Sequence, residues 1–232
     1  MDLVSCLCVT RARPAMLRRA VAAFHAQTHA ERELVVVFES DDGATRACLE
    51  GLAGPSLRAV EVPAAPKRTL GELRNICAAA ARGRYVAQWD DDDWHAPGRL
   101  AAQLAVARGR VAAGCVLLRW TLYDAPLRQA YVSGRRTWEG SLLIERAALP
   151  PYPALARGED SEVVKALLAA GRLCGLDHRP ELYVYVHHGA NTWGRAFFKR
   201  NMAAHAEALC AAETRRIERL LGVPGAALAV AD

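Results

Sequence analysis

Short apolar runs alternate with helix-like segments in the first part of the chain. Residues 3–9 and 34–38 are apolar, rich in valine and too short for a helix, which predicts two buried strands. Between them, residues 14–27 carry apolar side chains at helical spacing and open with a proline, which is favoured at the first helical position. The pattern therefore predicts a strand, a helix and a second strand in succession.

The same alternation continues to about residue 110. Residues 57–62 predict a weaker strand and residues 85–89 another. Thr69 precedes Glu72 at the spacing of a helix capping box, and a further helix begins near Pro97. Strands that alternate with helices in this way form a parallel sheet with right-handed crossovers.

Ligands of open α/β sheets bind outside the carboxyl ends of the strands. Thr10, Glu39 and the residues after Trp89 each follow a predicted strand. We therefore expect them to meet in one cleft.

The alternation of predicted strands and helices ends after residue 110. Residues 111–118, 129–132 and 141–144 predict strands without clear helices between them, which favours antiparallel or mixed pairing. Residues 160–170 then predict a helix, 182–187 a strand and 197–221 one long amphipathic helix. No linker rich in serine, glycine or proline divides the chain, so we expect one continuous domain.

Composition excludes several classes of protein. The 232 residues are 52% hydrophobic and 24% charged, with a mean hydropathy of +0.01, which is typical of a globular protein and not of a disordered or collagen-like one. The net charge is +5, but only three of the 30 basic residues are lysines and the arginines are spread along the chain. No basic run is interleaved with aromatic residues, so we expect no nucleic-acid partner.

The seven cysteines form no Cys-x-x-Cys pair, which argues against a zinc knuckle or a disulfide framework. They are interpreted as buried thiols of a reducing compartment. The chain shows no signal-peptide pattern and no apolar stretch of about 18 residues. We therefore expect a cytoplasmic protein.

The strongest chemical signal is the run Asp90, Asp91, Asp92 and Asp93, directly after a predicted buried strand. Four adjacent carboxylates repel one another unless a cation or hydrogen-bond donors offset the charge, and Mg²⁺ and Mn²⁺ prefer oxygen ligands. A metal held there could bridge to substrate phosphates. The alternative is a solvated loop that caps the helix near Pro97.

Several further motifs accompany this run in a fixed order. They are Thr10 at the end of the first strand, residues 41–45 (DDGAT), 71–75 (GELRN), 82–87 (RGRYVA) before Asp90, and 158–160 (GED). In order and approximate spacing the set resembles the family 2 glycosyltransferases over most of the chain. The resemblance implies an α/β fold of GT-A type, Rossmann-like, with a mixed, mainly parallel central sheet flanked by helices.

The resemblance also implies a function. Residues 1–110 would form the nucleotide-sugar-binding half, and residues 111–232 the acceptor-binding half with its C-terminal helix. The enzyme would move a single sugar from a nucleoside diphosphate sugar to a hydroxyl of a glycan, lipid-linked or protein acceptor, with inversion, in bacterial surface polysaccharide or glycoconjugate assembly. A retaining transferase, and a catalytically silent nucleotide-sugar-binding partner module, remain the alternatives.

By the same resemblance Asp90 and Asp92 form the DxD motif. Asp92 would be the direct ligand of Mn²⁺ or Mg²⁺, and Asp90 would face the ribose or the donor sugar. Neighbouring side chains of a strand point to opposite faces, so only one of His187 and His188 can reach the metal. We favour His188 as the second ligand; a solvent-exposed histidine pair is the alternative.

Further donor-binding residues follow from the resemblance. Thr10, Glu39, Asp41 and Asp42 would line the nucleobase and ribose pocket, although Asp41 and Asp42 also suit a plain turn. Asp91 belongs to the same donor-binding set. Arg74, with Asn75, Lys67 and Arg68 nearby, would bind the diphosphate or base, the alternative for Arg74 being a surface helix arginine.

Asp160 would be the general base that takes the proton from the acceptor hydroxyl, and a single base implies direct displacement with inversion. A helix N-cap is the alternative role for Asp160. Trp94, Trp138 and Trp193 lie beside polar motifs and are candidates for stacking on a sugar, with core packing as the alternative.

The chain contains no Gln-x-x-Arg-Trp sequence and no transmembrane segment, which argues against a processive, membrane-embedded synthase. The apolar stripe of the predicted C-terminal helix leaves open a peripheral contact with the inner face of the cell membrane, or a homodimer.

Overall fold

The computed structural model describes residues 2–224. Its helices are α1 (Pro14–His25), α2 (Gly43–Glu50), α3 (Leu70–Ala80), α4 (Arg99–Gly109), α5 (Glu159–Ala169), α6 (Arg195–Asn201) and α7 (Ala211–Leu221). Its strands are β1 (Val4–Val9), β2 (Arg32–Glu39), β3 (Leu57–Val62), β4 (Tyr85–Gln88), β5 (Trp94–His95), β6 (Gly114–Leu117), β7 (Thr121–Asp124), β8 (Gln129–Val132), β9 (Trp138–Glu145), β10 (Leu173–Leu176), β11 (Tyr183–His187) and β12 (Glu207–Ala208).

A seven-stranded sheet in the order β10-β6-β9-β4-β1-β2-β3 forms the centre of the molecule. Strands β4, β1, β2 and β3 are parallel, whereas β9 runs antiparallel to both β4 and β6. The carboxyl ends of β1, β2 and β4 therefore lie along one edge of the sheet, as the sequence predicts.

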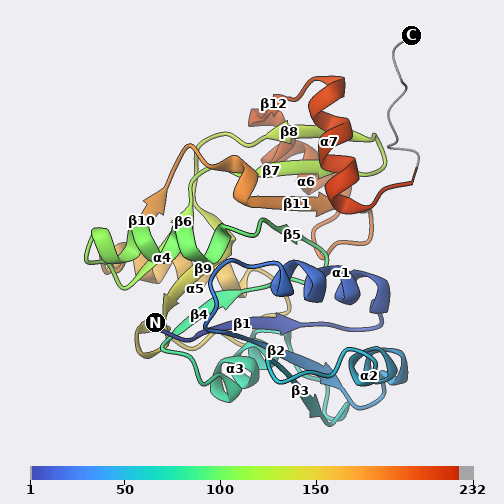
Figure 1. Cartoon of the computed structure of the whole chain (residues 1–232), viewed down its shortest axis with the longest axis vertical. Coiled ribbons are helices and arrows are strands. Elements are labelled where there is room, and N and C mark those ends of the chain that lie inside the picture. Colours follow the sequence, from blue (N-terminus) through green and yellow to red (C-terminus); the bar gives the residue numbers. More distant parts are fainter. Residues whose placement is uncertain (1, 225–232) are drawn as a thin grey trace.

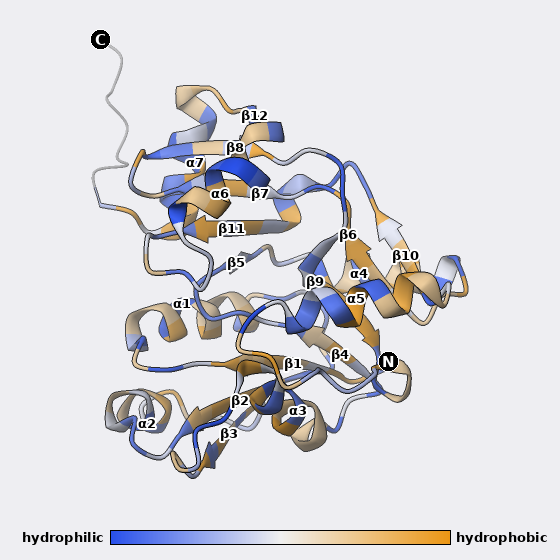
Figure 2. Ribbon diagram, turned by 180° about the vertical axis from the view of Figure 1, so that it is seen from behind, coloured by the Kyte–Doolittle hydropathy of each residue, from blue (hydrophilic) through white to orange (hydrophobic). Residues whose placement is uncertain are grey.

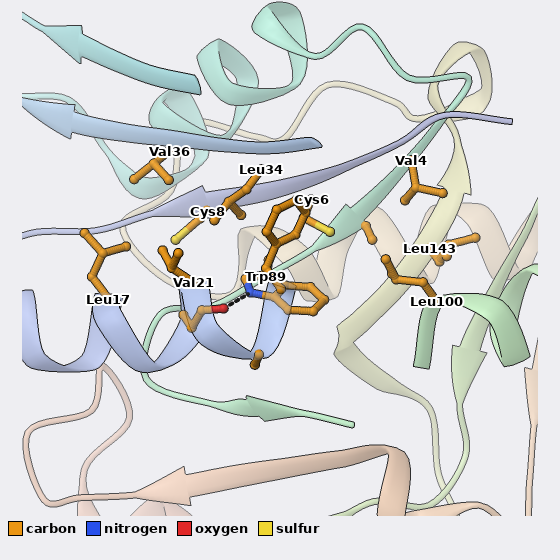
Figure 3. Packing of buried hydrophobic residues seen from close by; sticks show 14 of the residues in the cluster. Val4, Cys6, Cys8, Leu17, Val21, Leu34, Val36, Trp89, Leu100 and Leu143 are labelled. Carbon is orange, nitrogen blue, oxygen red and sulfur yellow. Dashed lines mark hydrogen bonds between the residues drawn. The ribbon is translucent and has the colours of Figure 1, made fainter. Parts of the chain in front are cut away.

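Helices cover both faces of this sheet. On one face α1 and α4 pack against β1, β2 and β4 around Trp89, whose indole N–H donates to the Ala20 carbonyl at 3.1 Å (Figure 3). On the other face α3 and α5 pack around Cys77 and Val163. Strands β1 and β2 are buried on both sides and are predominantly hydrophobic (Figure 2), as expected for central parallel strands.

A second sheet was not predicted. It has five strands in the order β12-β8-β7-β11-β5 and lies at the opposite end of the molecule from β3, with α1 between the two regions (Figure 1). Strand β5 follows β4 by only a short turn, so the segment after the central sheet leads directly into this second sheet. The aspartate run occupies that turn.

Most predicted elements are confirmed, with boundaries shifted by a few residues, but the single helix expected over 197–221 is wrong. The chain there forms α6, a short 3-10 turn at Ala203–His205, the strand β12 and then α7. Glu207 and Ala208 pair with β8, and this pairing interrupts the helical periodicity. The pairing with a distant strand thus overrides the local preference of this segment for a helix.

The expected buried thiols are found at six of the seven cysteines; Cys210 is exposed. Trp89 and Trp120 are buried, as the sequence predicts. Within residues 2–224 no helix is both long enough and apolar enough to span a membrane.

The amino end of α3 is fixed against the segment that leads to α5. Thr69 and Glu72 form the predicted capping box. The Gly71 N–H donates to the Leu155 carbonyl at 3.1 Å, and the Asn75 side chain donates to the Tyr152 carbonyl at 2.8 Å. A Cβ at Gly71 would lie 1.8 Å from the Pro153 carbonyl oxygen, so only glycine permits this approach.

Gly71→Ala is therefore expected to destabilise the protein by about 1–3 kcal/mol, because the clash is with backbone atoms that cannot rotate away. For a chain of this size that corresponds to a fall in Tm of roughly 2–4 °C per kcal/mol, measurable by calorimetry. Gly43→Ala is the matched control, since Gly43 is also helical and nothing lies within 4 Å of its added Cβ. Equal stability of the two variants would contradict this packing.

Candidate functional site

A cavity of about 200 Å³ opens beside the end of β4. Its wall includes the whole run Asp90, Asp91, Asp92 and Asp93, together with residues from β9, the start of α5 and the segment before α6. Asp91 and Asp93 are buried, while Asp90 and Asp92 are partly exposed. The alternation places Asp90 and Asp92, the pair predicted as the DxD motif, where a ligand can reach them.

Asp91 is the buried member nearest to β1. Its carboxylate accepts a hydrogen bond from the Thr10 hydroxyl and forms an ion pair with Arg13 at 2.7 Å. Burial, reinforced by the negative charge of Asp92, raises the pKa of Asp91 to about 7. Thr10 is thus bonded to the aspartate run and does not line the cavity.

Asp92 is in contact with a guanidinium group and an imidazole ring. Arg13 donates to its carboxylate at 2.8 Å, and His188 Nε2 lies 3.2 Å from the same oxygen. Burial opposes ionisation, but the hydrogen bond to His188 and the charge of Arg13 hold the pKa of Asp92 below its usual value. Asp92 is therefore kept negative.

Asp93 joins the two sheets. The Tyr183 hydroxyl and the Val186 N–H, both on β11, donate to its carboxylate, the latter at 2.9 Å. Burial, with the charges of Asp92 and Asp90, raises the pKa of Asp93 well above its usual range. This residue fixes the turn after β4 against the second sheet.

Asp90 belongs to a network that reaches α5. Arg74, buried on α3, donates to Asp90 at 3.0 Å and to Glu159 at 2.7 Å. The Gln88 amide donates to Asp90 at 3.1 Å and to Asp160 at 3.4 Å. One buried network therefore holds Asp90, Glu159 and Asp160 in the same wall of the cavity.

Asp160 is not an N-cap. Gly158 occupies the cap position of α5 with φ of +77°, and Asp160 lies in the first turn, where its carboxylate also accepts from the Ser161 N–H at 2.7 Å. Asp160 lines the cavity and its side chain is partly exposed. A carboxylate in this position can accept a proton from a group bound in the cavity.

The two adjacent histidines have different surroundings. His187 is buried, with its ring stacked on Phe198 at a centroid distance of 4.4 Å. Burial lowers the pKa of His187, so it is held neutral. His188 lies against Asp92 instead, as strand alternation predicts.

The residues expected around the nucleobase lie at the ends of β1 and β2, outside the cavity wall. Glu39 is buried and its carboxylate accepts hydrogen bonds from Arg11 and Lys67. Arg11 also pairs with exposed Asp41 at 2.8 Å. Asp42 caps α2 by accepting from the Thr45 N–H at 3.0 Å.

Asp92 and His188 are the residues at the aspartate run that could hold a divalent metal. Among residues 2–224 no group of three or more His, Cys, Asp or Glu side chains is gathered so as to hold an ion unaided. Asp92 and His188 supply a carboxylate oxygen and an imidazole nitrogen within 3.2 Å of each other. Mg²⁺ and Mn²⁺ are commonly held by one or two protein ligands, with phosphate oxygens and water completing the shell.

Sequence reasoning missed several residues of the site. Arg13, which pairs with two members of the aspartate run, lies in the connection from β1 to α1 and carries no motif. Of the three tryptophans expected to stack on sugars, Trp138 and Trp193 line the cavity and Trp94 does not. The cavity-lining residues that were not predicted as site residues include Val9, Leu70, Arg136, Arg157, Ser161, Tyr185, Asn191, Thr192, Phe197 and Met202.

Solved structures share this fold. Residues 1–349 of TarS from S. aureus superpose with a TM-score of 0.62 at 16% identity, over 79% of this chain and 60% of that one. The same fragment in complex with UDP-GlcNAc gives 0.60 at 16% identity, over 95% and 66% of the two chains. The mannosyltransferase PcManGT from Pyrobaculum calidifontis, in complex with GDP-Man and Mn²⁺, gives 0.59 at 15% identity, over 94% and 64%.

The chain thus spans 60% to 66% of the length of these proteins, and the likeness establishes the expected GT-A fold. No curated protein matches the chain in sequence. The family model of glycosyl transferase family 2 matches residues 5–143, which include most of β1, the aspartate run and most of β9. The resemblance drawn from the motifs is therefore confirmed: the chain belongs to glycosyl transferase family 2.

Proposed function

We propose that this protein is a metal-dependent, inverting glycosyltransferase that moves one sugar from a nucleoside diphosphate sugar to an acceptor hydroxyl, in the assembly of bacterial surface polysaccharides or glycoconjugates. The observation that carries the proposal is the single buried network of Arg74 and Gln88, which brings Asp90 and Asp160 to one cavity. A donor site at Asp90 and a proton acceptor at Asp160 would then lie side by side. Nucleotide-sugar complexes of proteins with the same fold support this assignment.

Asp92 and His188 would hold the divalent ion, with Asp90 beside them facing the ribose or the donor sugar. When bound, Mn²⁺ or Mg²⁺ stabilises the negative charge that develops on the leaving diphosphate. Arg13 pairs with both Asp91 and Asp92, and its positive charge would offset the repulsion between these two carboxylates before the donor binds. Glu39 and Asp41, at the end of β2, would contribute to the nucleobase and ribose pocket.

Asp160 would act as the general base. Its carboxylate accepts the proton of the acceptor hydroxyl while that oxygen attacks the anomeric carbon and the bond to the diphosphate breaks. A single displacement inverts the configuration of that carbon. The residues of the first half would bind the donor and those after residue 110 the acceptor.

Calorimetric titration of UDP, GDP, dTDP and CDP tests the donor site. We expect one of them to bind in the presence of Mn²⁺ or Mg²⁺, and the binding to be lost with a chelator and in Asp92→Ala, because Asp92 carries the ion that neutralises the diphosphate. Glu181→Ala, an exposed carboxylate outside the cavity wall, is the matched control. Binding that survives both the chelator and Asp92→Ala would remove the metal from the mechanism.

Asp160→Asn is expected to lower kcat by about 10²- to 10⁴-fold, the usual contribution of a general base, while the affinity for the nucleotide stays unchanged. The measurement is sugar transfer or donor hydrolysis, with the anomer of the product read by NMR. Glu162→Gln, an exposed carboxylate in the same first turn of α5, is the control. Full turnover by Asp160→Asn would assign the base elsewhere, and a product with retained configuration would exclude single displacement.

Arg74→Met is expected to destabilise the fold by about 3–5 kcal/mol, since it leaves Glu159 as an uncompensated buried charge. The double variant Arg74→Met with Glu159→Gln restores part of that stability, because the buried charge is removed with its partner. Denaturant unfolding of the single and double variants measures the coupling. Additive losses in the double variant would show that the pair is not coupled.

A further inference from the structure

Two arginines of the cavity wall have no carboxylate partner. Arg13 and Arg74 are paired with members of the aspartate run, whereas Arg136 and Arg157 have no carboxylate oxygen within 4.0 Å among residues 2–224. The neighbouring Arg135, by contrast, forms an ion pair with Asp177 at 2.8 Å. The two unpaired guanidinium groups are therefore the cations of the cavity wall that remain free to bind a ligand.

Aromatic rings hold both guanidinium groups in place. The Cζ of Arg136 lies 5.3 Å from the Trp120 ring centroid, and that of Arg157 lies 5.4 Å from the Trp193 centroid. Trp193 in turn stacks on Phe197 with centroids 4.3 Å apart. Stacking on an indole face orients a guanidinium but leaves the N–H groups at its edge available to an oxoanion.

Both arginines belong to the second half of the chain. Arg136 lies between β8 and β9, two residues before Trp138 of the cavity wall, and Arg157 lies three residues before Asp160. The acceptor hydroxyl must reach Asp160, so the body of the acceptor lies against this part of the wall. An acceptor with a negative charge would be repelled by Asp160 and Glu139 unless nearby cations offset the repulsion.

We propose that the acceptor carries an oxoanion, either a carboxylate or a phosphate, close to the hydroxyl that is glycosylated, and that Arg136 and Arg157 bind it. This inference rests on the proposed function. The planar fork of each guanidinium suits two oxygens of one oxoanion, and Trp138 and Trp193 line the same wall of the cavity.

The test measures binding of three probes to the wild-type protein: methyl glucuronide, glucose-6-phosphate and the neutral methyl glucoside. Titrations are followed by ligand-observed NMR in the presence of the nucleoside diphosphate and a divalent metal. Mg²⁺ is used instead of Mn²⁺ to avoid paramagnetic broadening. We expect at least one anionic probe to bind about tenfold more tightly than the neutral one, and added NaCl to weaken this preference. Arg136→Gln and Arg157→Gln should each reduce the anionic affinity about five- to tenfold.

Arg135→Gln is the matched control, because its guanidinium is exposed, adjacent in sequence and outside the cavity wall. Equal binding of charged and neutral probes, no binding of either anion, or the same loss in Arg135→Gln overturns the inference. Nucleotide affinity is measured for every variant in parallel. A weaker nucleotide affinity in Arg157→Gln would assign that residue to the donor diphosphate, whereas a wild type that binds no nucleotide would overturn the proposed function itself.

Discussion

The accommodation of four consecutive carboxylates at the end of β4 organises this structure. Asp91 and Asp93 are buried, and a buried carboxylate is tolerated only with a partner or a proton. Each member of the run has different partners. Asp90 meets Arg74 of α3, Asp91 meets Thr10 and Arg13 at the end of β1, Asp92 meets His188, and Asp93 meets Tyr183 and Val186 of β11.

These contacts bring together elements that are distant in the sequence. The central sheet, the second sheet and the starts of α1, α3 and α5 all converge on one turn, and the cavity lies where they meet. The arrangement also separates the chemical roles within the run. The buried aspartates fix the geometry, whereas Asp90 and Asp92 stay accessible to a ligand, close to Asp160 through the Gln88 amide.

The parallel half of the fold could be predicted from the sequence because its signals are local. Valine-rich runs, Pro14, and the capping pair Thr69 and Glu72 each act within a few residues of their own position. The second sheet could not be predicted, because β5 and β12 are two-residue strands that exist only through pairing with distant partners. The same pairing broke the expected C-terminal helix.

As with the fold, one part of the candidate site could be predicted from the sequence and another part could not. The aspartate run and Asp160 could be predicted from motifs, and the run shares one cavity with Asp160. The cations that neutralise the charge of the aspartate run could not be predicted. The sequence does not distinguish an arginine whose side chain is solvated from one, such as Arg13, whose side chain forms an ion pair. Arg74, predicted to bind the diphosphate or base, lines the cavity and is buried between Asp90 and Glu159, so it is not a surface helix arginine. Only the packing of α3 against the start of α5 places it there.

A crystal structure of the protein grown with Mn²⁺ and the nucleoside diphosphate that it binds, with the metal located by anomalous diffraction, would show whether the aspartate run holds a cation. We predict one anomalous peak coordinated by Asp92 and His188, next to the diphosphate, with the Arg13 guanidinium displaced from the Asp92 carboxylate. A nucleotide bound in the cavity with no metal beside it, and with Arg13 still paired to Asp92, would contradict the proposal that this run of carboxylates binds a divalent cation.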